Sequence, residues 1–529
     1  MSARSKIAKA AGKMSVATLV SRILGYIKDM ILAGFFGASA SADVFFAAFR
    51  IPNLLRELFA EGSMSSAFIP VLKEEEAQRG DEAARKVVRS VFLFIIVFVG
   101  FICLLGVIFA PAIVSAIAPG FLEDQAKFDT TVLLTRIMFP FLLFISLASL
   151  TMGALNTRGV FFIPALAPAL LNIVTMISVV GFSAIFAQPI VSVAIGVCAG
   201  RFVQFLFQVP EFKKQGFSFT GRGFSFKDLS NPALKKIGRL VLPATAGMAV
   251  NQINIFVSTI LASFLAEGSI TYLYYSMRLV QFPVGIFGVA VGMAVLPALS
   301  EHAVRGDIKS VKEDFSFALR LLFFLTVPAM AGLIALKMPI VSTLFQRGQF
   351  DYAATVGTAD ALMFYSFGIW AIVGVRVITS TFYSMQDTKT PVKIVAVTTL
   401  LNIVLSLLLM GPMKHNGLAL ANAAASTANF GLLYFLLRKK IGSFGSSQIV
   451  VSVLKTLCAS IVMAAAGWLM LSSGLWMHAS SVPGNWLFLS IGIVLCFAIY
   501  LTASYLLKSE EMLYLTGKVS QKIWQGGGR

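Results

Sequence analysis

The chain has 529 residues, of which 57% are hydrophobic and only 13% are charged, with a formal net charge of +19. Soluble domains carry about 25% charged residues, so this composition excludes an ordinary soluble protein and indicates an integral membrane protein. Apolar runs of about 20 residues, the length that crosses the ~30 Å hydrocarbon core, recur along the whole chain.

Hydropathy predicts about fourteen membrane spans and therefore an all-α polytopic membrane protein. The first six spans cover residues 14–37, 42–70, 88–112, 130–155, 161–187 and 190–210. After a basic connection, six more cover residues 238–265, 269–299, 315–337, 355–384, 391–412 and 415–437. A last pair covers residues 449–472 and 485–507.

The first two spans carry more charge than a lipid-facing helix tolerates. They contain four cations and four acids: Arg22, Lys28, Asp29, Asp43, Arg50, Arg56, Glu57 and Glu61. Each charge at membrane depth costs about 2.5–3.5 kcal/mol on insertion scales, so these side chains must face protein, water or a ligand. Two interpretations follow: the charges form internal ion pairs, or the cations line a cavity that receives an anion.

Helical spacing permits both interpretations. Arg22 and Asp29 are seven residues apart and share a helix face, as do Asp43 and Arg50. Pro52 interrupts the second span just after Arg50. Such a break in a charged span commonly lines a cavity.

Lysine and arginine outside the spans lie almost entirely on alternate connections. If the N-terminus is cytoplasmic, the cytoplasmic segments hold 29 of these residues and the outer segments hold 4. The positive-inside rule therefore predicts an even number of spans with both termini in the cytoplasm. The same distribution explains most of the basic excess without a nucleic-acid partner.

Short motifs recur at a nearly constant offset between the two groups of six spans. Arg50 has a counterpart in Arg278, 228 residues later, and Pro70 has one in Pro297, 227 residues later. The sequence Leu-Asn-Ile-Val at residues 171–174 recurs at 401–404. Since six spans separate the copies, we predict two parallel six-helix lobes around a central cavity, as in transporters built from repeats.

The repeat divides the chain into four predicted segments. They are the N-terminal lobe 1–210, the basic cytoplasmic linker 211–237, the C-terminal lobe 238–440, and residues 441–529 with two extra helices and the tail. In the linker, four phenylalanines alternate with polar residues, as in a segment lying at the membrane interface: Phe217, Phe219, Phe224 and Phe226. Ser230 or Asn231 followed by Pro232 predicts the start of the next helix.

Arg278 favours the cavity interpretation. Its span, 269–299, contains no acidic residue, and the nearest one, Glu267, lies about three turns away. Arginine's planar fork matches phosphate oxygens. Because Arg50 and Arg278 occupy equivalent places in the repeat, we expect them to face one another across the cavity. These residues predict a transporter for an anionic, phosphorylated substrate.

No enzyme signature competes with transport. The chain lacks the P-loop, HExxH and GxSxG patterns, so neither ATP-driven pumping nor catalysis by this chain is expected. Its four cysteines lie in apolar segments without metal-ligand spacing, and no disulfide or metal site is predicted. Arg136 and Arg201 are placed close enough to span ends to reach the interface, and Arg376 is left without a role.

Three segments around these charges carry specific motifs. They are Ser-Arg-Ile-Leu-Gly-Tyr-Ile-Lys-Asp at 21–29, Phe-Arg-Ile-Pro-Asn-Leu-Leu-Arg-Glu-Leu-Phe-Ala-Glu-Gly at 49–62, and Tyr-Tyr-Ser-Met-Arg-Leu-Val-Gln-Phe-Pro at 274–283. In these motifs, and over nearly its whole length, the chain resembles the MurJ (MviN) lipid II flippases of the multidrug/oligosaccharidyl-lipid/polysaccharide exporter superfamily. The resemblance implies two six-helix lobes, two extra helices forming a groove for a polyprenyl tail, and movement of lipid-linked peptidoglycan precursor to the outer leaflet.

The resemblance also implies which residues act. The cations that match substrate-binding positions of the family are Arg22, Lys28, Arg50, Arg56 and Arg278. The candidates for holding these cations while no lipid is bound are Asp29, Asp43, Glu57 and Glu61. Lys28 stands where arginine is common in the family, so it keeps the charge but not bidentate recognition.

The expected partners are lipid II and membrane lipids, without nucleic acid. We expect a monomer in the bacterial plasma (inner) membrane that contacts the cell-wall synthesis machinery. No cofactor or metal is expected, and the membrane potential is favoured over ATP or sodium as the energy source. Three alternatives stay open: an exporter of another polyprenyl-linked glycan, a drug exporter, and a non-transporting membrane scaffold.

Overall fold

The computed structural model describes residues 3–57, 63–219, 226–472 and 483–514. Every regular element in these ranges is a helix, which confirms the all-α prediction. Ten of the described helices are long and apolar enough to cross a membrane. Three others are also long enough to cross it: α1 (Ala3–Phe36), α10 (Pro232–Ser263) and α11 (Ser269–Val304), with 34, 32 and 36 residues. The chain is thus a multi-pass membrane protein, and the figure of about fourteen spans stays a prediction.

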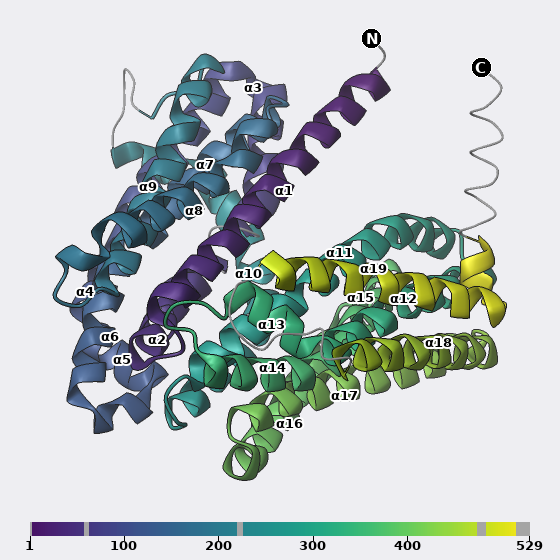
Figure 1. The fold of residues 1–529 in the computed structure, drawn as a ribbon. Helices are drawn as coiled ribbons and strands as arrows, with labels where there is room; N and C mark the ends of the chain where they lie inside the picture. Colours follow the sequence, from purple (N-terminus) through teal and green to yellow (C-terminus); the bar gives the residue numbers. More distant parts are fainter. Residues whose placement is uncertain (1–2, 58–62, 220–225, 473–482, 515–529) are drawn as a thin grey trace. The chain divides into compact units, whose positions relative to one another are not determined.

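The chain forms two compact units, Met1–Gly268 and Ser269–Arg529. Besides α1 and α10, the first unit contains the helices α2 (Ala40–Arg56), α3 (Ser63–Phe94), α4 (Gly100–Ile108), α5 (Ala110–Ile117), α6 (Gln125–Met138), α7 (Phe141–Thr157), α8 (Phe162–Phe182) and α9 (Val191–Lys214) (Figure 1). Its short helical turns are Ile95–Val99, Pro119–Glu123, Ser183–Ile185 and Phe226–Ser230.

Small residues bring α8 and α9 close together in the first unit. A Cβ atom at Gly200 would lie 2.9 Å from the carbonyl oxygen of Leu171, and one at Gly196 would lie 2.7 Å from Cβ of Ser178. This is the small-xxx-small packing of helices in lipid, where close backbone approach replaces the hydrophobic effect. Helices α1 and α2, with Glu57 after them, form the charged hairpin. Helix α8 also packs along α1, so the α8–α9 pair supports the first helix of this hairpin.

The second unit contains α11 to α19. After α11 come α12 (Ile308–Ala335), α13 (Lys337–Phe345), α14 (Tyr352–Ser366), α15 (Ile369–Ser384), α16 (Lys389–Met413), α17 (His415–Ile441), α18 (Ser446–Ser472) and α19 (Pro483–Leu506). Helix α16 packs along α17, and α12 along α18 (Figure 1). The hydroxyl of Tyr500 on α19 donates to the carbonyl oxygen of Phe324 on α12 at 2.6 Å, which attaches the last helix to the unit.

Helix α10 begins where the sequence predicts. Asn231 is its N-cap and accepts a hydrogen bond from the Ala233 amide at 3.0 Å, and Pro232 is the first helical residue. The Asn231 amide also donates to Ser90 on α3 at 3.0 Å, and Lys236 binds Glu74 at 2.6 Å. The repeat groups this helix with the C-terminal lobe, whereas these two contacts lie within the first unit.

The linker aromatics differ from the prediction of an interfacial segment. Phe217 is buried against the Phe212 ring at 5.3 Å, beneath the Arg158 guanidinium at 5.1 Å. Phe219 stacks on Phe212 and contacts the tilted ring of Phe92, with both ring centroids 4.6 Å away. These two rings therefore pack into the first unit, because neighbouring helices offer an aromatic surface that local sequence does not reveal. Phe224 lies outside the described residues.

Candidate functional site

The charged side chains of α1 differ in burial. The Arg22 side chain is exposed, whereas the Asp29 side chain is fully buried. Lys28 reaches Asp29 with Nζ 3.0 Å from Oδ1, and 17% of its side chain is exposed. Since a buried carboxylate needs a compensating charge, this ion pair explains how Asp29 is accommodated.

Asn172 on α8 fixes the backbone beside Arg22. Its side-chain amide donates to the Ser21 carbonyl oxygen on α1 at 3.2 Å, and to Pro168 of its own helix at 3.4 Å. The Ser21 carbonyl precedes Arg22 directly, so this contact sets the rotation of α1 about its axis. Asn172 belongs to the Leu-Asn-Ile-Val motif of the repeat, for which the sequence analysis assigned no role.

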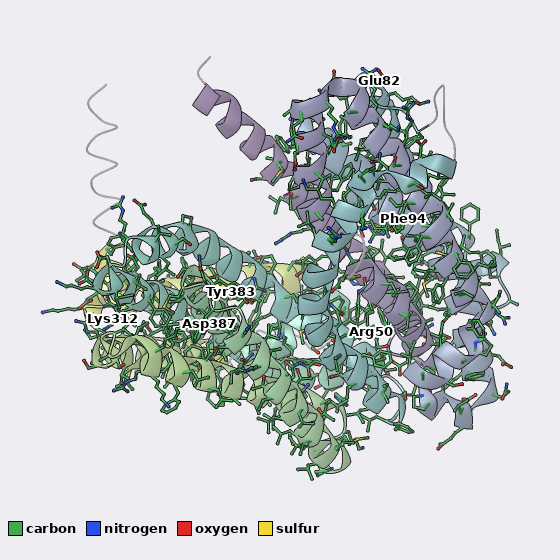
Figure 2. All side chains as sticks on the ribbon, turned by 180° about the vertical axis from the view of Figure 1, so that it is seen from behind. Arg50, Glu82, Phe94, Lys312, Tyr383 and Asp387 are labelled. Carbon is green, nitrogen blue, oxygen red and sulfur yellow. The ribbon has the colours of Figure 1, made fainter. Side chains whose placement is uncertain are left out.

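The end of α2 carries a compact polar cluster. Arg56 donates from Nε to Asn53 Oδ1 at 3.0 Å and from Nη2 to Glu57 Oε1 at 3.1 Å. The Asn53 amide donates to the same Glu57 oxygen at 3.2 Å, and the Gln252 amide on α10 donates to the other. Glu57 is therefore held from two helices. Arg50 lies half-buried on α2, two residues before Pro52 (Figure 2).

Asp43 joins the other end of α2 to the segment after α10. It is buried, and its Oδ2 accepts a hydrogen bond from the Gly268 amide at 2.7 Å. In return, the Glu267 carboxylate accepts from the Ala40 amide in the first turn of α2. An acidic group at a helix N-terminus is favoured by the unsatisfied amides and the helix dipole there. Glu61 lies outside the described residues.

The second unit contributes Arg278, which lies half-buried on α11. Neighbouring Tyr275 is fully buried, with its ring 4.6 Å from Phe345. Arg376, without a predicted role, lies on α15 and crosses α11 at Gly288: a Cβ there would be 3.1 Å from Nη1 of Arg376. A larger residue at this position would push the guanidinium away, so Gly288 makes room for a second arginine beside α11.

Arg201 contradicts its predicted placement near a span end. It lies midway along α9, its side chain is 7% exposed, and it donates to Gln204 at 2.7 Å. Its guanidinium stands 5.0 Å from the Phe141 ring centre. Residue 201 is also central in the predicted span 190–210, so the prediction was wrong in assigning it to a span end and not in the bounds of the span.

Four of the predicted residues in the described part of the first unit meet in the ion pairs Lys28–Asp29 and Arg56–Glu57. The structure adds three polar residues that sequence reasoning missed: Asn53, Asn172 and Gln252. The first stands inside the hairpin motif and the second inside the repeat, so their positions were available, whereas Gln252 gave no signal. Among the described residues, no group of three or more His, Cys, Asp and Glu side chains is placed to hold a metal ion.

Comparisons with known proteins identify the family of this chain. A family model described as lipid II flippase MurJ matches residues 32–486. "Lipid II flippase MurJ" of Burkholderia cenocepacia is 36% identical over 424 residues, covering 80% of this chain and 82% of that protein. "Probable lipid II flippase MurJ" of Vibrio cholerae serotype O1 is 38% identical over 428 residues, covering 80% and 81%. The protein of that name in Bdellovibrio bacteriovorus is 33% identical and covers 96% of both chains.

Solved structures are also similar to this chain. One described as lipid II flippase MurJ in an inward closed conformation has a TM-score of 0.76 and 28% identity, covering 93% of this chain and 98% of its own. An inward-facing multidrug MATE transporter of the MOP superfamily has a TM-score of 0.66 at 15% identity, covering 83% and 99%, and is similar in fold alone. This chain therefore belongs to the lipid II flippase MurJ family, a family of transporters and not of enzymes.

Proposed function

We propose that this protein moves lipid II from the cytoplasmic to the outer leaflet of the bacterial plasma membrane by alternating access between two lobes. A polar sugar–peptide head cannot cross hydrocarbon, so it would travel in a central cavity while the polyprenyl tail stays in lipid. The diphosphate would be bound by cations of both lobes: Arg22, Lys28, Arg50, Arg56 and Arg278.

The polar cluster at the end of α2 is the observation that carries this proposal. Arg56 and Glu57 are adjacent in the chain, and Gln252 and Asn53 also donate to Glu57. If a phosphate took over Arg56, the half-buried Glu57 carboxylate would keep two donors, so the exchange leaves neither charge without a partner. A cation held in this way can be released to substrate without disrupting the helix.

The outer contacts of α2 would take part in the cycle. Asp43 and Glu267 each accept a backbone amide from the segment that carries the other. We propose that these contacts break when the cavity opens outward and form again on return. A negative cell interior favours the return of a cationic cavity by ~2.3 kcal/mol per charge per 100 mV, which makes the membrane potential a sufficient drive.

Leaflet-resolved labelling of lipid II after depletion of the protein tests the function. We expect precursor to accumulate in the inner leaflet and to reach the outer leaflet again when the intact gene is restored. Precursor that still reaches the outer leaflet in cells without a substitute flippase would contradict the proposal.

Arg278→Ala tests the diphosphate contact, with Arg305→Ala as its matched control. Arg305 follows the same helix, but it is exposed and pairs with Glu301. We expect loss of outward labelling only for the Arg278 variant, with both proteins present at normal abundance. Preferential transport of a different polyprenyl-linked glycan by the purified protein would instead favour the alternative cargo.

A further inference from the structure

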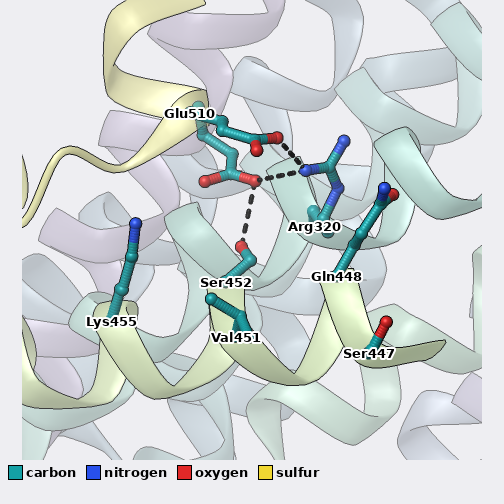
Figure 3. Close-up of a pocket in the computed structure, with 8 residues that line it drawn as sticks. Arg320, Ser447, Gln448, Val451, Ser452, Lys455 and Glu510 are labelled. Carbon is teal, nitrogen blue, oxygen red and sulfur yellow. Dashed lines mark hydrogen bonds and ion pairs between the residues drawn. The ribbon is translucent and has the colours of Figure 1, made fainter. Parts of the chain in front are cut away.

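A polar pocket lies in the second unit, apart from the residues proposed to bind lipid II. It has a volume of about 180 Å³ and is formed by α12, α18 and the segment after α19 (Figure 3). Its lining residues are Arg320, Ser447, Gln448, Val451, Ser452, Lys455, Glu510 and Glu511. This volume matches roughly six water molecules, so it admits a small headgroup but not a disaccharide–peptide.

On one side of the pocket, the polar and charged side chains already bind one another. The Glu511 side chain is 2% exposed, accepts hydrogen bonds from Ser452 at 2.9 Å and Ser509 at 2.8 Å, and lies 3.6 Å from Arg320. Arg320 also forms an ion pair with Glu510. These contacts attach the segment after α19 to α12 and α18, so this half of the pocket is structural.

On the other side of the pocket, Glu510 and Lys455 have hydrogen-bonding groups that a ligand can use. The Glu510 side chain is 74% exposed and has accepting capacity beyond its pair with Arg320. Lys455 is half-buried and donates one hydrogen bond, to the Lys508 carbonyl oxygen at 3.0 Å, although its ammonium carries three donors. Figure 3 places Lys455 on one side of Glu510 and Arg320 on the other.

The pocket borders the lipid-facing surface. Helix α19 ends at Leu506, so Glu510 lies just beyond the span. Large apolar side chains around the pocket are exposed: Val450, Val451, Leu454, Leu506 and Leu513. Under the positive-inside assignment this end of α19 is cytoplasmic. The pocket is therefore at the depth of the headgroups of the cytoplasmic leaflet, with room for acyl chains beside it.

The charged side chains of the pocket indicate which lipid headgroup it would bind. Two cations and two carboxylates give a formal sum of zero, which does not favour an anionic lipid, yet the charges are separated in space. We propose that the pocket binds the headgroup of phosphatidylethanolamine, with its primary ammonium on Glu510 and its phosphate on Lys455. A choline headgroup has no N–H to donate, so it would be bound more weakly.

Lipid titration of the intact purified protein tests this proposal. The protein is delipidated in detergent and titrated with phosphatidylethanolamine, phosphatidylcholine or phosphatidylglycerol of identical acyl chains, and binding is followed by native mass spectrometry. We expect phosphatidylethanolamine to bind at least tenfold more tightly than the other two. Glu510→Gln and Lys455→Gln should each abolish this preference, whereas Glu301→Gln, an exposed carboxylate elsewhere in the unit, should not.

Three outcomes would overturn the proposal. The first is equal binding of the three lipids, and the second is a preference unchanged in both pocket variants. The third is equally tight binding of soluble phosphoethanolamine, which would assign the pocket to a soluble ligand. If Glu510→Gln fails to fold, Lys455→Gln serves as the test variant. The Lys455 ammonium donates to the Lys508 carbonyl oxygen, so its replacement breaks no contact with another side chain in the described part of the chain. None of these outcomes depends on lipid II transport.

Discussion

The charged hairpin of the first unit and the charged ends of the second unit pair their charges in different ways. In the hairpin, both ion pairs join sequence neighbours, Lys28 with Asp29 and Arg56 with Glu57. In the second unit, two ion pairs join distant residues: Asp387 and Lys440 are 53 residues apart, and Arg320 and Glu510 are 190 apart. The exposed pair Arg305–Glu301 of that unit is local.

This difference separates two uses of charge in one protein. A pair between sequence neighbours cannot hold two helices together, so breaking it costs no tertiary contact. A pair between distant residues fixes one element on another, and its loss loosens the bundle. Variants at Arg56 should therefore affect transport more than stability, and variants at Asp387 and Lys440 should do the reverse.

Arg56→Ala should have the largest effect. We expect lipid II transport in proteoliposomes to fall at least 100-fold, which corresponds to about 2.7 kcal/mol, because the phosphate loses a bidentate donor. The melting temperature should stay within about 1 °C of the wild type, since Gln252 and Asn53 still hold Glu57. Arg56→Lys should lie between, about tenfold down. Normal transport by the alanine variant would remove this residue from the site.

Gln252→Leu should slow transport by about tenfold. Without this donor, Glu57 depends more strongly on Arg56, so the cation is released to the diphosphate less readily; a hydrogen bond to a charged group contributes about 1.5–3 kcal/mol. Gln208→Leu is the control, because it removes a buried amide that bonds to the Ala148 carbonyl and to no acid. Equal losses of transport in both variants would indicate a general packing defect.

Asp387→Asn should lower stability by about 0.5–1 kcal/mol at neutral pH with little change in transport. The hydrogen bond from Lys440, followed by the Thr390 amide, lowers the pKa of Asp387 from 3.8 to about 2. Because the folded-state pKa is depressed, the stabilisation is present above about pH 4 and is lost as pH falls towards 2. The difference in melting temperature between wild type and variant should therefore shrink over that range.

A double-variant cycle with Lys440→Met checks that assignment. Lys440 Nζ lies 2.6 Å from Asp387 Oδ2 and 5.7 Å from the Phe382 ring centre. If the two residues stabilise each other, the double variant loses less than the two single losses added together. Strict additivity would show that the pair does not connect α17 to the turn before α16.

Arg305→Ala should have the smallest effect. Its partner Glu301 lies one turn earlier, and their side chains are 67% and 61% exposed. Exposed pairs of this kind contribute about 0.3–0.5 kcal/mol, so neither the melting temperature nor transport should change measurably. A loss of transport here would mean that charge near the end of α11 matters in general, which would weaken the argument from Arg278.

Much of the fold and part of the site follow from local sequence. Hydropathy predicted helices because a chain in hydrocarbon must satisfy its backbone hydrogen bonds within each segment. The excess charge of the hairpin predicted where polar interactions would gather, and Asn231-Pro232 predicted the start of α10. The sequence did not predict which side chains the packing of the helices would bury. Arg201, placed near a span end, lies buried in mid-helix, and Phe217 is packed inside the first unit.

By itself, the sequence determined the membrane class, the all-helical fold, the family motifs and the location of the intramembrane charges, because each is read from composition or short-range spacing. Tertiary structure alone decided which groups meet. Gln252 contacts Glu57 across 195 residues, Asn172 contacts Ser21 across 151, and Glu511 contacts Ser452 across 59. Such partners depend on how helices rotate and pack against one another, and neither hydropathy nor periodicity within a single helix contains that information.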